Sequence, residues 1–196
     1  MNIPQLPDSA PFSTEQRAWL NGFMAALVQG QMAAGGAAPA GMPAPAAAEP
    51  KAPVSILWGS QTGNSEGLAK KAAKKLTAEG FEPKVIDMGS YDFAQLPSEK
   101  NVLIITSTYG DGEAPDNAQP LHEALMASEE ANLGDTNFAV FGLGDSEYPD
   151  FCQCSKDFDA QLEKLGAKRI LDRIDCDVDF DDEFKGWIAA LPGAIA

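Results

Sequence analysis

A hydroxyl- and glycine-rich loop between Gly59 and Ser65 carries the first residues whose types and spacing indicate chemistry. It follows a short apolar run and precedes a stretch of leucine and alanine at helical spacing, so it joins a strand to a helix. Free backbone N–H groups and the positive helix end meet at such a junction and favour an anion. Ser60, Thr62 and Ser65 add hydroxyl donors, and Gly63 permits backbone conformations closed to other residues. The loop therefore predicts a phosphate site.

Two common nucleotide motifs are absent from this loop. It lacks the Gly-x-x-x-x-Gly-Lys-Ser/Thr pattern of a P-loop and the Gly-x-Gly-x-x-Gly pattern of a dinucleotide site. No Lys or Arg lies between Gly59 and Ala69. A phosphate held here would therefore be held by neutral donors, and an ordinary hydroxylated turn between strand and helix is the alternative interpretation.

Two further loops each bring one tyrosine, small residues and acids to the end of an expected strand, over residues 107–117 and 142–152. Tyr109 and Tyr148 can stack on the two sides of a flat ring system. The neighbouring glycines, which let backbone amides approach the ring edge, are Gly110, Gly112, Gly142 and Gly144. Either tyrosine alone could simply cap the sheet. Together, beside the phosphate loop, they predict a site for a phosphorylated ligand with a flat ring.

Cys152 lies next to the expected ring but has no activating residue near it in the sequence. The sole histidine, His122, is expected inside a helix and at the surface. Because a catalytic thiolate needs an activator, we expect Cys152 to pack against the ligand instead. With Cys154 and Cys176, the cysteines are too few and too irregularly spaced for a disulfide framework or a zinc site. No catalytic residue and no metal ligand is predicted.

Strands alternate with helices from Val54 onward. The strand candidates are Val54–Trp58, Pro83–Asp87, Val102–Ser107, Phe138–Leu143 and Arg169–Leu171, and helical segments lie near residues 64–79, 116–128, 151–165 and 180–191. Five strands separated by helices predict an α/β fold with a doubly wound parallel sheet. Ligands of such sheets bind at the carboxyl ends of the strands, and all three loops follow those ends.

Residues 1–32 are predicted to form a separate helical segment, and residues 33–53 an Ala/Pro/Gly linker. Ser13 and Gln16 have capping-box spacing ahead of an apolar stripe. Because one helix cannot bury such a stripe alone, we expect it to pack on its own domain, to self-associate or to contact a partner. The globular domain is expected over residues 54–196.

The net charge of the 196 residues is −15. This charge opposes binding to nucleic acid or to an anionic membrane surface, and it favours a basic protein partner or simple solubility. The first residues lack the basic and apolar regions of a signal peptide, and no apolar run approaches the length of a membrane span. A soluble, cytoplasmic protein is expected.

Three ordered motifs resemble the FMN domain of the diflavin reductases. They are Ser-Gln-Thr-Gly-Asn at 60–64, Ser-Thr-Tyr-Gly-Asp-Gly-Glu at 107–113 and Leu-Gly-Asp-Ser-Glu-Tyr-Pro-Asp-Phe-Cys at 143–152. Phe-Cys-Gln-Cys-Ser-Lys-Asp-Phe-Asp at 151–159 and Leu-Asp-Arg-Ile-Asp at 171–175 are most similar to the sulfite reductase flavoprotein branch. The resemblance covers the expected globular domain and extends weakly to the N-terminal helix. It implies a flavodoxin-like five-stranded sheet with strand order 2-1-3-4-5.

The same resemblance implies FMN as the cofactor and assigns roles residue by residue. The phosphate would be bound by Ser60, Gln61, Thr62, Gly63, Asn64 and Ser65. One side of the isoalloxazine would be lined by Ser107, Thr108, Tyr109 and Gly110, and the other by Leu143, Gly144, Asp145, Ser146, Glu147, Tyr148, Pro149, Asp150, Phe151 and Cys152. Tyr109 stands where the sulfite reductase branch often has Gln and the microsomal cytochrome-reductase branch has Tyr, which leaves the electron acceptor open.

By resemblance, the chain is the FMN module of an NADPH-dependent sulfite reductase, an oxidoreductase of cysteine biosynthesis. Electrons would run from NADPH through FAD to this FMN, and then singly to a sulfite-reducing haemoprotein. The chain ends just after its last expected helix, so we expect the FAD/NADPH module to lie outside it. The alternatives are a stand-alone flavodoxin-like carrier, a quinone reductase that itself holds nicotinamide, and a flavin-free receiver domain. A receiver would need acids after the first and third strands, where Trp58-Gly59-Ser60 and Ser107-Thr108-Tyr109 stand instead.

Acidic side chains lie in or beside both ring loops, namely Asp111, Glu113, Asp145, Glu147 and Asp150. Their charge would disfavour added negative charge on the ring, and it would attract a basic partner. Solvation of exposed loops is the alternative interpretation for each of them.

Overall fold

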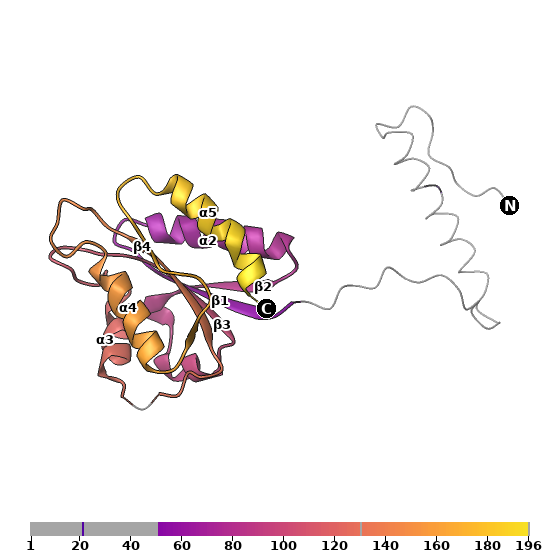
Figure 1. The fold of residues 1–196 in the computed structure, drawn as a ribbon, viewed down its shortest axis with the longest axis horizontal. Helices are drawn as coiled ribbons and strands as arrows, with labels where there is room; N and C mark the ends of the chain where they lie inside the picture. The colour runs from indigo at the N-terminus through magenta and orange to yellow at the C-terminus, as the bar shows by residue number, and fades with distance from the viewer. Residues whose placement is uncertain (1–20, 22–50, 130, 196) are drawn as a thin grey trace. The chain divides into compact units, whose positions relative to one another are not determined.

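The computed structural model describes Asn21, residues 51–129 and residues 131–195 (Figure 1). The chain divides into two units, residues 1–47 and 48–196. Of the first unit, Asn21 is described and is helical. The rest of the expected N-terminal helix and nearly all of the expected linker lie outside the described residues, so both stay predictions.

The second unit is built on a parallel sheet with the strand order β2-β1-β3-β4-β5. Four of its strands agree with the predicted strands to within one residue at each end: β1 (Pro53–Gly59), β2 (Glu82–Asp87), β3 (Asn101–Ser107) and β4 (Asn137–Leu143). The register places Ile56 beside Leu103, and Leu103 beside Ala139. The predicted flavodoxin-like order is therefore confirmed.

Helices cover both faces of this sheet. Helices α2 (Asn64–Ala78) and α5 (Asp181–Ala194) lie on one face, and α3 (Gln119–Ala127) and α4 (Gln153–Lys164) lie on the other (Figure 1). Two short 3-10 helices, η1 (Met88–Ser90) and η2 (Phe93–Ser98), follow β2.

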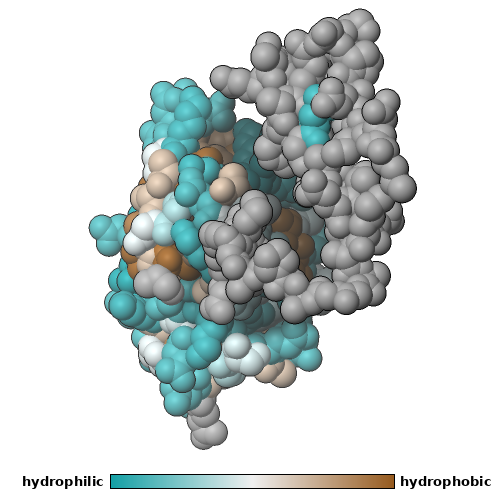
Figure 2. Space-filling model, turned by 90° about the vertical axis from the view of Figure 1, so that its right-hand side faces the viewer, coloured by the Kyte–Doolittle hydropathy of each residue, from teal (hydrophilic) through white to brown (hydrophobic). Residues whose placement is uncertain are grey.

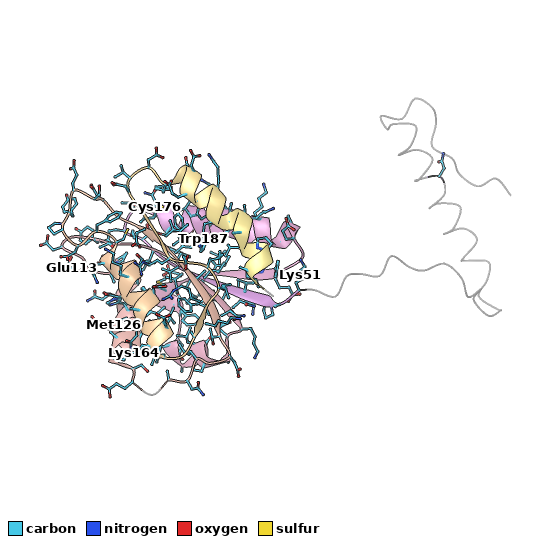
Figure 3. All side chains as sticks on the ribbon, in the orientation of Figure 1. Lys51, Glu113, Met126, Lys164, Cys176 and Trp187 are labelled. Atoms are coloured by element: carbon cyan, nitrogen blue, oxygen red, sulfur yellow. The ribbon has the colours of Figure 1, made fainter. Side chains whose placement is uncertain are left out.

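The central strands serve two hydrophobic cores, one on each face. Leu103 and Ile105 belong to the core with α2 and α5, whereas Val102 and Ile104 belong to the core with α3 and α4. This alternation follows from the period of two residues in a strand. Because both faces are covered, β3 and β4 are continuous apolar runs. Trp187, labelled in Figure 3, packs between α5 and the sheet.

The fifth position of the sheet is divided between two short strands, β5 (Lys168–Arg169) and β6 (Ile174–Cys176). Phe138 pairs with Arg169 and Phe141 pairs with Ile174, so an advance of three residues along β4 matches an advance of five along its neighbour. Two residues between β5 and β6 are therefore extra and do not pair with β4. The strand expected at Arg169–Leu171 is therefore shorter than predicted, and β6 was missed. The consequence is a further loop, after β6, at the carboxyl edge of the sheet.

Two helices begin later than expected. Helix α3 starts at Gln119 rather than at 116, because Ala118 N donates to Pro115 O (2.7 Å) in a preceding turn. Helix α4 starts at Gln153 rather than at 151, after Cys152, whose backbone is left-handed (φ 55°). Both shifts lie at the carboxyl edge, where they change which side chains reach the site.

The two ends of this domain differ in what they carry. Lys51 lies at the end where β1 begins, and Glu113 lies at the opposite end (Figure 3). Figure 2 views the domain from the side of Lys51, and most of its coloured surface there is hydrophilic. In the parts of the chain that the structure describes, no helix combines the length and the apolar character needed to cross a membrane.

Candidate functional site

A cavity of about 520 Å³ opens at the carboxyl edge of the sheet. It is lined by Asn64 at the start of α2, by Ser107, Thr108, Tyr109 and Gly110 after β3, by Leu143, Gly144, Asp145, Tyr148, Asp150, Phe151 and Cys152 after β4, and by Asp177, Val178 and Phe180 after β6. Small-molecule pockets span roughly 300–1,000 Å³. Both the size and the position therefore fit a small-ligand site of an open α/β sheet.

The structure brings most of the predicted ring-side residues onto one cavity wall or another. Three of them, Ser146, Glu147 and Pro149, lie on the same loop without lining the cavity. Of the six predicted phosphate-binding residues, 60–65, Asn64 lines the cavity. The other five, residues 60–63 and Ser65, belong to the adjoining loop and the first turn of α2.

Sequence reasoning missed the wall formed by Asp177, Val178 and Phe180. The rule that ligands gather after strand ends would have found it, had the strand at 174–176 been recognised. That strand has only three residues, one of them an aspartate, and the strand expected at Arg169–Leu171 already filled the fifth position of the sheet.

The phosphate loop leaves backbone donors free at the start of α2. Gly63, in a left-handed conformation (φ 87°), is the N-cap and has no side chain to cap the helix. The first helical hydrogen bond runs from Gly67 N to Gly63 O (3.1 Å). The N–H groups of Asn64 and Ser65 precede it and have no intrahelical acceptor. Ser60 Oγ accepts from Gly63 N (3.0 Å) and so shapes the loop.

Ser65 adds a donor to this helix end. Its hydroxyl is buried, and it has no hydrogen-bond partner among the described residues. A buried hydroxyl without a partner costs about 1–3 kcal/mol. An anionic acceptor at this helix end would satisfy it, together with the free backbone donors.

The loop after β3 is a tight hairpin. Tyr109 N donates to Glu113 O (2.9 Å), and Glu113 N donates to Tyr109 O (2.8 Å). Gly110 has φ 54°, a left-handed conformation that is strained for residues with a side chain, so glycine suits this position. Thr108 ties this hairpin to the next wall, because its N donates to Leu143 O (2.9 Å). The hairpin presents Tyr109 with 55% of its surface exposed.

The loop after β4 is held by the loop after β6. Gly144 N donates to Cys176 O (2.9 Å), and Ser146 donates from both its N and its Oγ to the Asp177 carboxylate. These hydrogen bonds hold the pKa of Asp177 below its usual range, with the Ser146 hydroxyl as the largest cause. Tyr148, on this loop, is 54% exposed. Both tyrosines thus line the cavity with about half of their surface free.

The cysteines near the cavity stay protonated at neutral pH. Burial, aided by the charge of Asp175, raises the pKa of the Cys152 thiol to about 12. Burial likewise raises the pKa of Cys154 to about 12 and that of Cys176 to about 11. A protonated, buried thiol can pack against a ligand but is a poor nucleophile. Among the described residues, no group of three or more His, Cys, Asp or Glu side chains could hold a metal ion.

The expectation of a surface position for His122 is wrong. Its side chain is 19% exposed, because Nε2 lies 3.1 Å from Asp157 Oδ2 and the ring contacts the edge of Phe158. The packing of α3 against α4 partly buries the His122 ring, which the helical pattern of the sequence had predicted to be at the surface.

Comparison with known proteins agrees with this geometry. The flavodoxin family matches residues 56–187. This chain belongs to the flavodoxin family. Solved flavodoxins from Streptococcus pneumoniae and Pseudomonas aeruginosa superpose with TM-scores of 0.66 and 0.64, at 28% and 32% identity. These superpositions cover 74% and 73% of this chain, and 97% and 98% of those flavodoxins.

Curated relatives are longer proteins. The sulfite reductase [NADPH] flavoprotein alpha-component of Bacillus subtilis is 45% identical over 193 residues, which cover 96% of this chain and 30% of that protein. The protein of the same name from Neisseria meningitidis serogroup A is 42% identical over 202 residues, covering 96% of this chain and 32% of that protein. The chain therefore spans about a third of the length of these relatives.

Membership of the flavodoxin family indicates FMN as the cofactor. The residues present fit that group. The unpartnered Ser65 hydroxyl and the uncapped helix end suit a phosphate, and the two half-exposed tyrosines suit a flat ring. The donors are neutral, as the absence of Lys and Arg from the loop predicts.

Proposed function

We propose that this chain is the FMN-binding electron-transfer domain of a sulfite reductase flavoprotein, an oxidoreductase module of cysteine biosynthesis. The observation that carries the proposal is the cavity lined by Tyr109 and Tyr148 at the carboxyl edge, next to the unpartnered Ser65 hydroxyl. The flavoprotein relatives, matched over 96% of this chain, support the choice of electron-transfer system.

Each wall of the cavity has a role in this proposal. Residues 60–65 bind the phosphate through backbone N–H groups and hydroxyls, and residues 107–110 and 143–152 hold the ring. Bound FMN would supply the ability to accept an electron pair and to release single electrons. The wall after β6 is added to this set, because Asp177 and Val178 line the same cavity.

The partners follow from the same proposal. An FAD/NADPH reductase module delivers electrons, and a sulfite-reducing haemoprotein receives them. A cytoplasmic location and self-association through the N-terminal segment, residues 1–32, complete the proposal. The half-exposed tyrosines leave the cavity open to such a partner.

FMN titration of Ser65→Ala tests the phosphate loop. Replacement removes a buried, unpartnered hydroxyl, so we expect the ligand-free protein to gain stability by up to about 1 kcal/mol. FMN affinity should fall about tenfold, because a donor to the phosphate is lost. Fluorescence quenching measures the affinity, and urea denaturation measures the stability.

The matched control is Ser55→Ala at the other end of β1. Ser55 is also buried, but its Oγ donates to Glu99 Oε2 (2.8 Å). We expect this variant to lose stability and to keep the wild-type FMN affinity. Absence of FMN binding by the wild type would overturn the proposed cofactor site, whereas equal affinity in Ser65→Ala would overturn the phosphate role of Ser65.

A second candidate is a stand-alone flavodoxin-like carrier, favoured because the solved flavodoxins are matched over 97–98% of their own length. Reconstitution separates the two. Added to the reductase module and haemoprotein of a sulfite reductase that lacks its own FMN domain, this chain should restore NADPH-dependent sulfite reduction. Binding of FMN without restoration would favour the carrier, and NADPH oxidation by the chain alone would indicate a quinone reductase.

A further inference from the structure

The phosphate loop is held from outside by the segment just before α3. Asn117 Oδ1 accepts from Ser60 N (2.9 Å). Its Nδ2 donates to Trp58 O (3.3 Å) and to Asp87 Oδ1 (3.0 Å). One half-buried amide therefore joins the end of β1, the loop after it and the end of β2.

The orientation of this amide is fixed by its neighbours. Both Nδ2 hydrogens have acceptors and Oδ1 has a donor, so its hydrogen-bonding groups are used in one orientation only. Asp87 is itself held, because its Oδ1 also accepts from Gly89 N (2.9 Å). A flipped amide would face two acceptors with its oxygen and a donor with its nitrogen.

The residues beside Asn117 reinforce this contact. Gln61 Nε2 donates to Asp116 Oδ2 (3.0 Å), and Asp116 N donates to Gln61 Oε1 (3.2 Å). A Cβ at Gly59 would lie 2.6 Å from Ala118 Cβ, so glycine is needed for the close approach. Residues 116–118, which we call the brace, thus contact the loop at three consecutive positions.

The brace decides which donors the loop keeps for a ligand. It uses the Ser60 N–H, whereas the Asn64 N–H has no intrahelical acceptor and the Ser65 hydroxyl has no partner among the described residues. We propose that Asn117 is the positioning residue of the phosphate loop, and that the brace sets the preference of the site for a phosphorylated ligand over its unphosphorylated counterpart. This inference rests on the proposed FMN site.

The test compares FMN with riboflavin, which has the same ring and no phosphate. In Asn117→Ala the loop loses its anchor, so FMN affinity should fall about tenfold while riboflavin affinity stays within about twofold. Asn117→Asp keeps the acceptor for Ser60 N but places a carboxylate next to that of Asp87. We expect this variant also to lower the ratio of FMN affinity to riboflavin affinity. Flavin fluorescence on titration with the ligand-free protein gives both affinities.

Asn101→Ala is the matched control for loss of stability alone. Asn101 is buried at the amino ends of the strands, donates to Pro53 O (3.1 Å) and accepts from Asn137 Nδ2 (3.0 Å). This variant should melt at a lower temperature with an unchanged ratio of the two affinities. If Asn117→Ala fails to fold, Asp87→Ala, which frees the Asn117 amide, should lower the same ratio by a smaller factor.

The outcomes separate this inference from the proposed function. An equal loss of FMN and riboflavin affinity, or no loss of either, would overturn the positioning role while leaving the FMN site in place. A wild-type protein that binds neither ligand would overturn the proposed site and this inference together. A selective loss of FMN affinity supports the positioning role.

Discussion

At the scale of single residues, Cys152 meets two constraints at the cavity: a left-handed backbone conformation and a buried side chain. It lies next to the start of α4. Small side chains suit this place, because a Cβ at Gly144 would lie 2.8 Å from Cys152 Sγ. The thiol therefore fills space between two loops that carry the site.

Alkylation tests the state of the thiols. Because burial raises the pKa of Cys152 and Cys154 to about 12, we expect neither to react with iodoacetamide at pH 8 in the folded protein. In denaturant all three cysteines should react, which mass spectrometry would show. Rapid modification of the native protein would contradict the buried, protonated state.

The same shifts predict how stability depends on pH. The thiol pKa values are raised in the folded protein above the ordinary value of 9.0, so the folded state holds protons that the unfolded state releases. This contribution is complete below pH 9 and is lost as the pH rises through the folded values. The free energy of unfolding should thus fall above pH 9, and less steeply in Cys154→Ala.

At the scale of elements, an ionic network joins α4 to the divided fifth strand. The buried carboxylate of Asp159 accepts from Arg169 Nε (2.8 Å) and from Arg173 Nη1 (2.9 Å). Arg173 also pairs with Asp175 of β6 (2.8 Å), and Asp175 in turn accepts from Ser155 of α4 (3.1 Å). The extra residues between β5 and β6 thus let two arginines reach one carboxylate.

Removing that carboxylate should destabilise the domain. Asp159→Asn removes the carboxylate that the two arginines share, while Arg169 keeps Glu163 and Arg173 keeps Asp175, and we expect a loss of about 1–3 kcal/mol. Urea denaturation measures the change. Asp182→Asn is the control, because its pair with Lys185 is exposed on both sides and should contribute nothing measurable. Equal effects of the two substitutions would contradict a structural role for the network.

At the scale of the whole molecule, negative charge gathers at the carboxyl edge. No Lys or Arg occurs between Lys100 and Lys156, and five of the seven residues at 177–183 are acidic. Tyr109, Tyr148 and Val178, the most exposed large apolar side chains among the described residues, all line the cavity. An apolar opening within acidic loops suits a small, transient contact with a basic partner.

The rate of association with the proposed haemoprotein partner should therefore depend on salt. Raising the ionic strength from about 0.01 to 0.5 M shortens the screening length, and we expect the association rate constant to fall at least about tenfold. Stopped-flow measurement gives this rate. The double variant Asp179→Asn with Asp182→Asn should be slower at low salt and less sensitive to salt. A rate that ignores ionic strength would count against electrostatic docking.

The sequence by itself determined the parallel α/β class, four of the strands and the main loops of the site, whereas the strand order followed from the resemblance to the diflavin reductases. Continuous apolar runs mark strands covered on both faces, and glycine, hydroxyl and tyrosine residues after them mark the carboxyl edge. Both signals are local, because burial period and turn chemistry are recorded within a few neighbouring residues. The two loops after β3 and β4, at residues 107–117 and 142–152, were therefore predictable.

Only the tertiary structure decided which distant segments meet. Asn117 bonds Ser60 across 57 positions, the loop after β6 closes the cavity, and His122 is covered by Asp157 and Phe158. Such contacts depend on how helices pack and on two extra residues in the fifth strand. No local pattern carries that information, because the same Asn or Asp residue can either hydrogen-bond to a distant loop or be exposed to water, and the neighbouring residues do not distinguish the two cases.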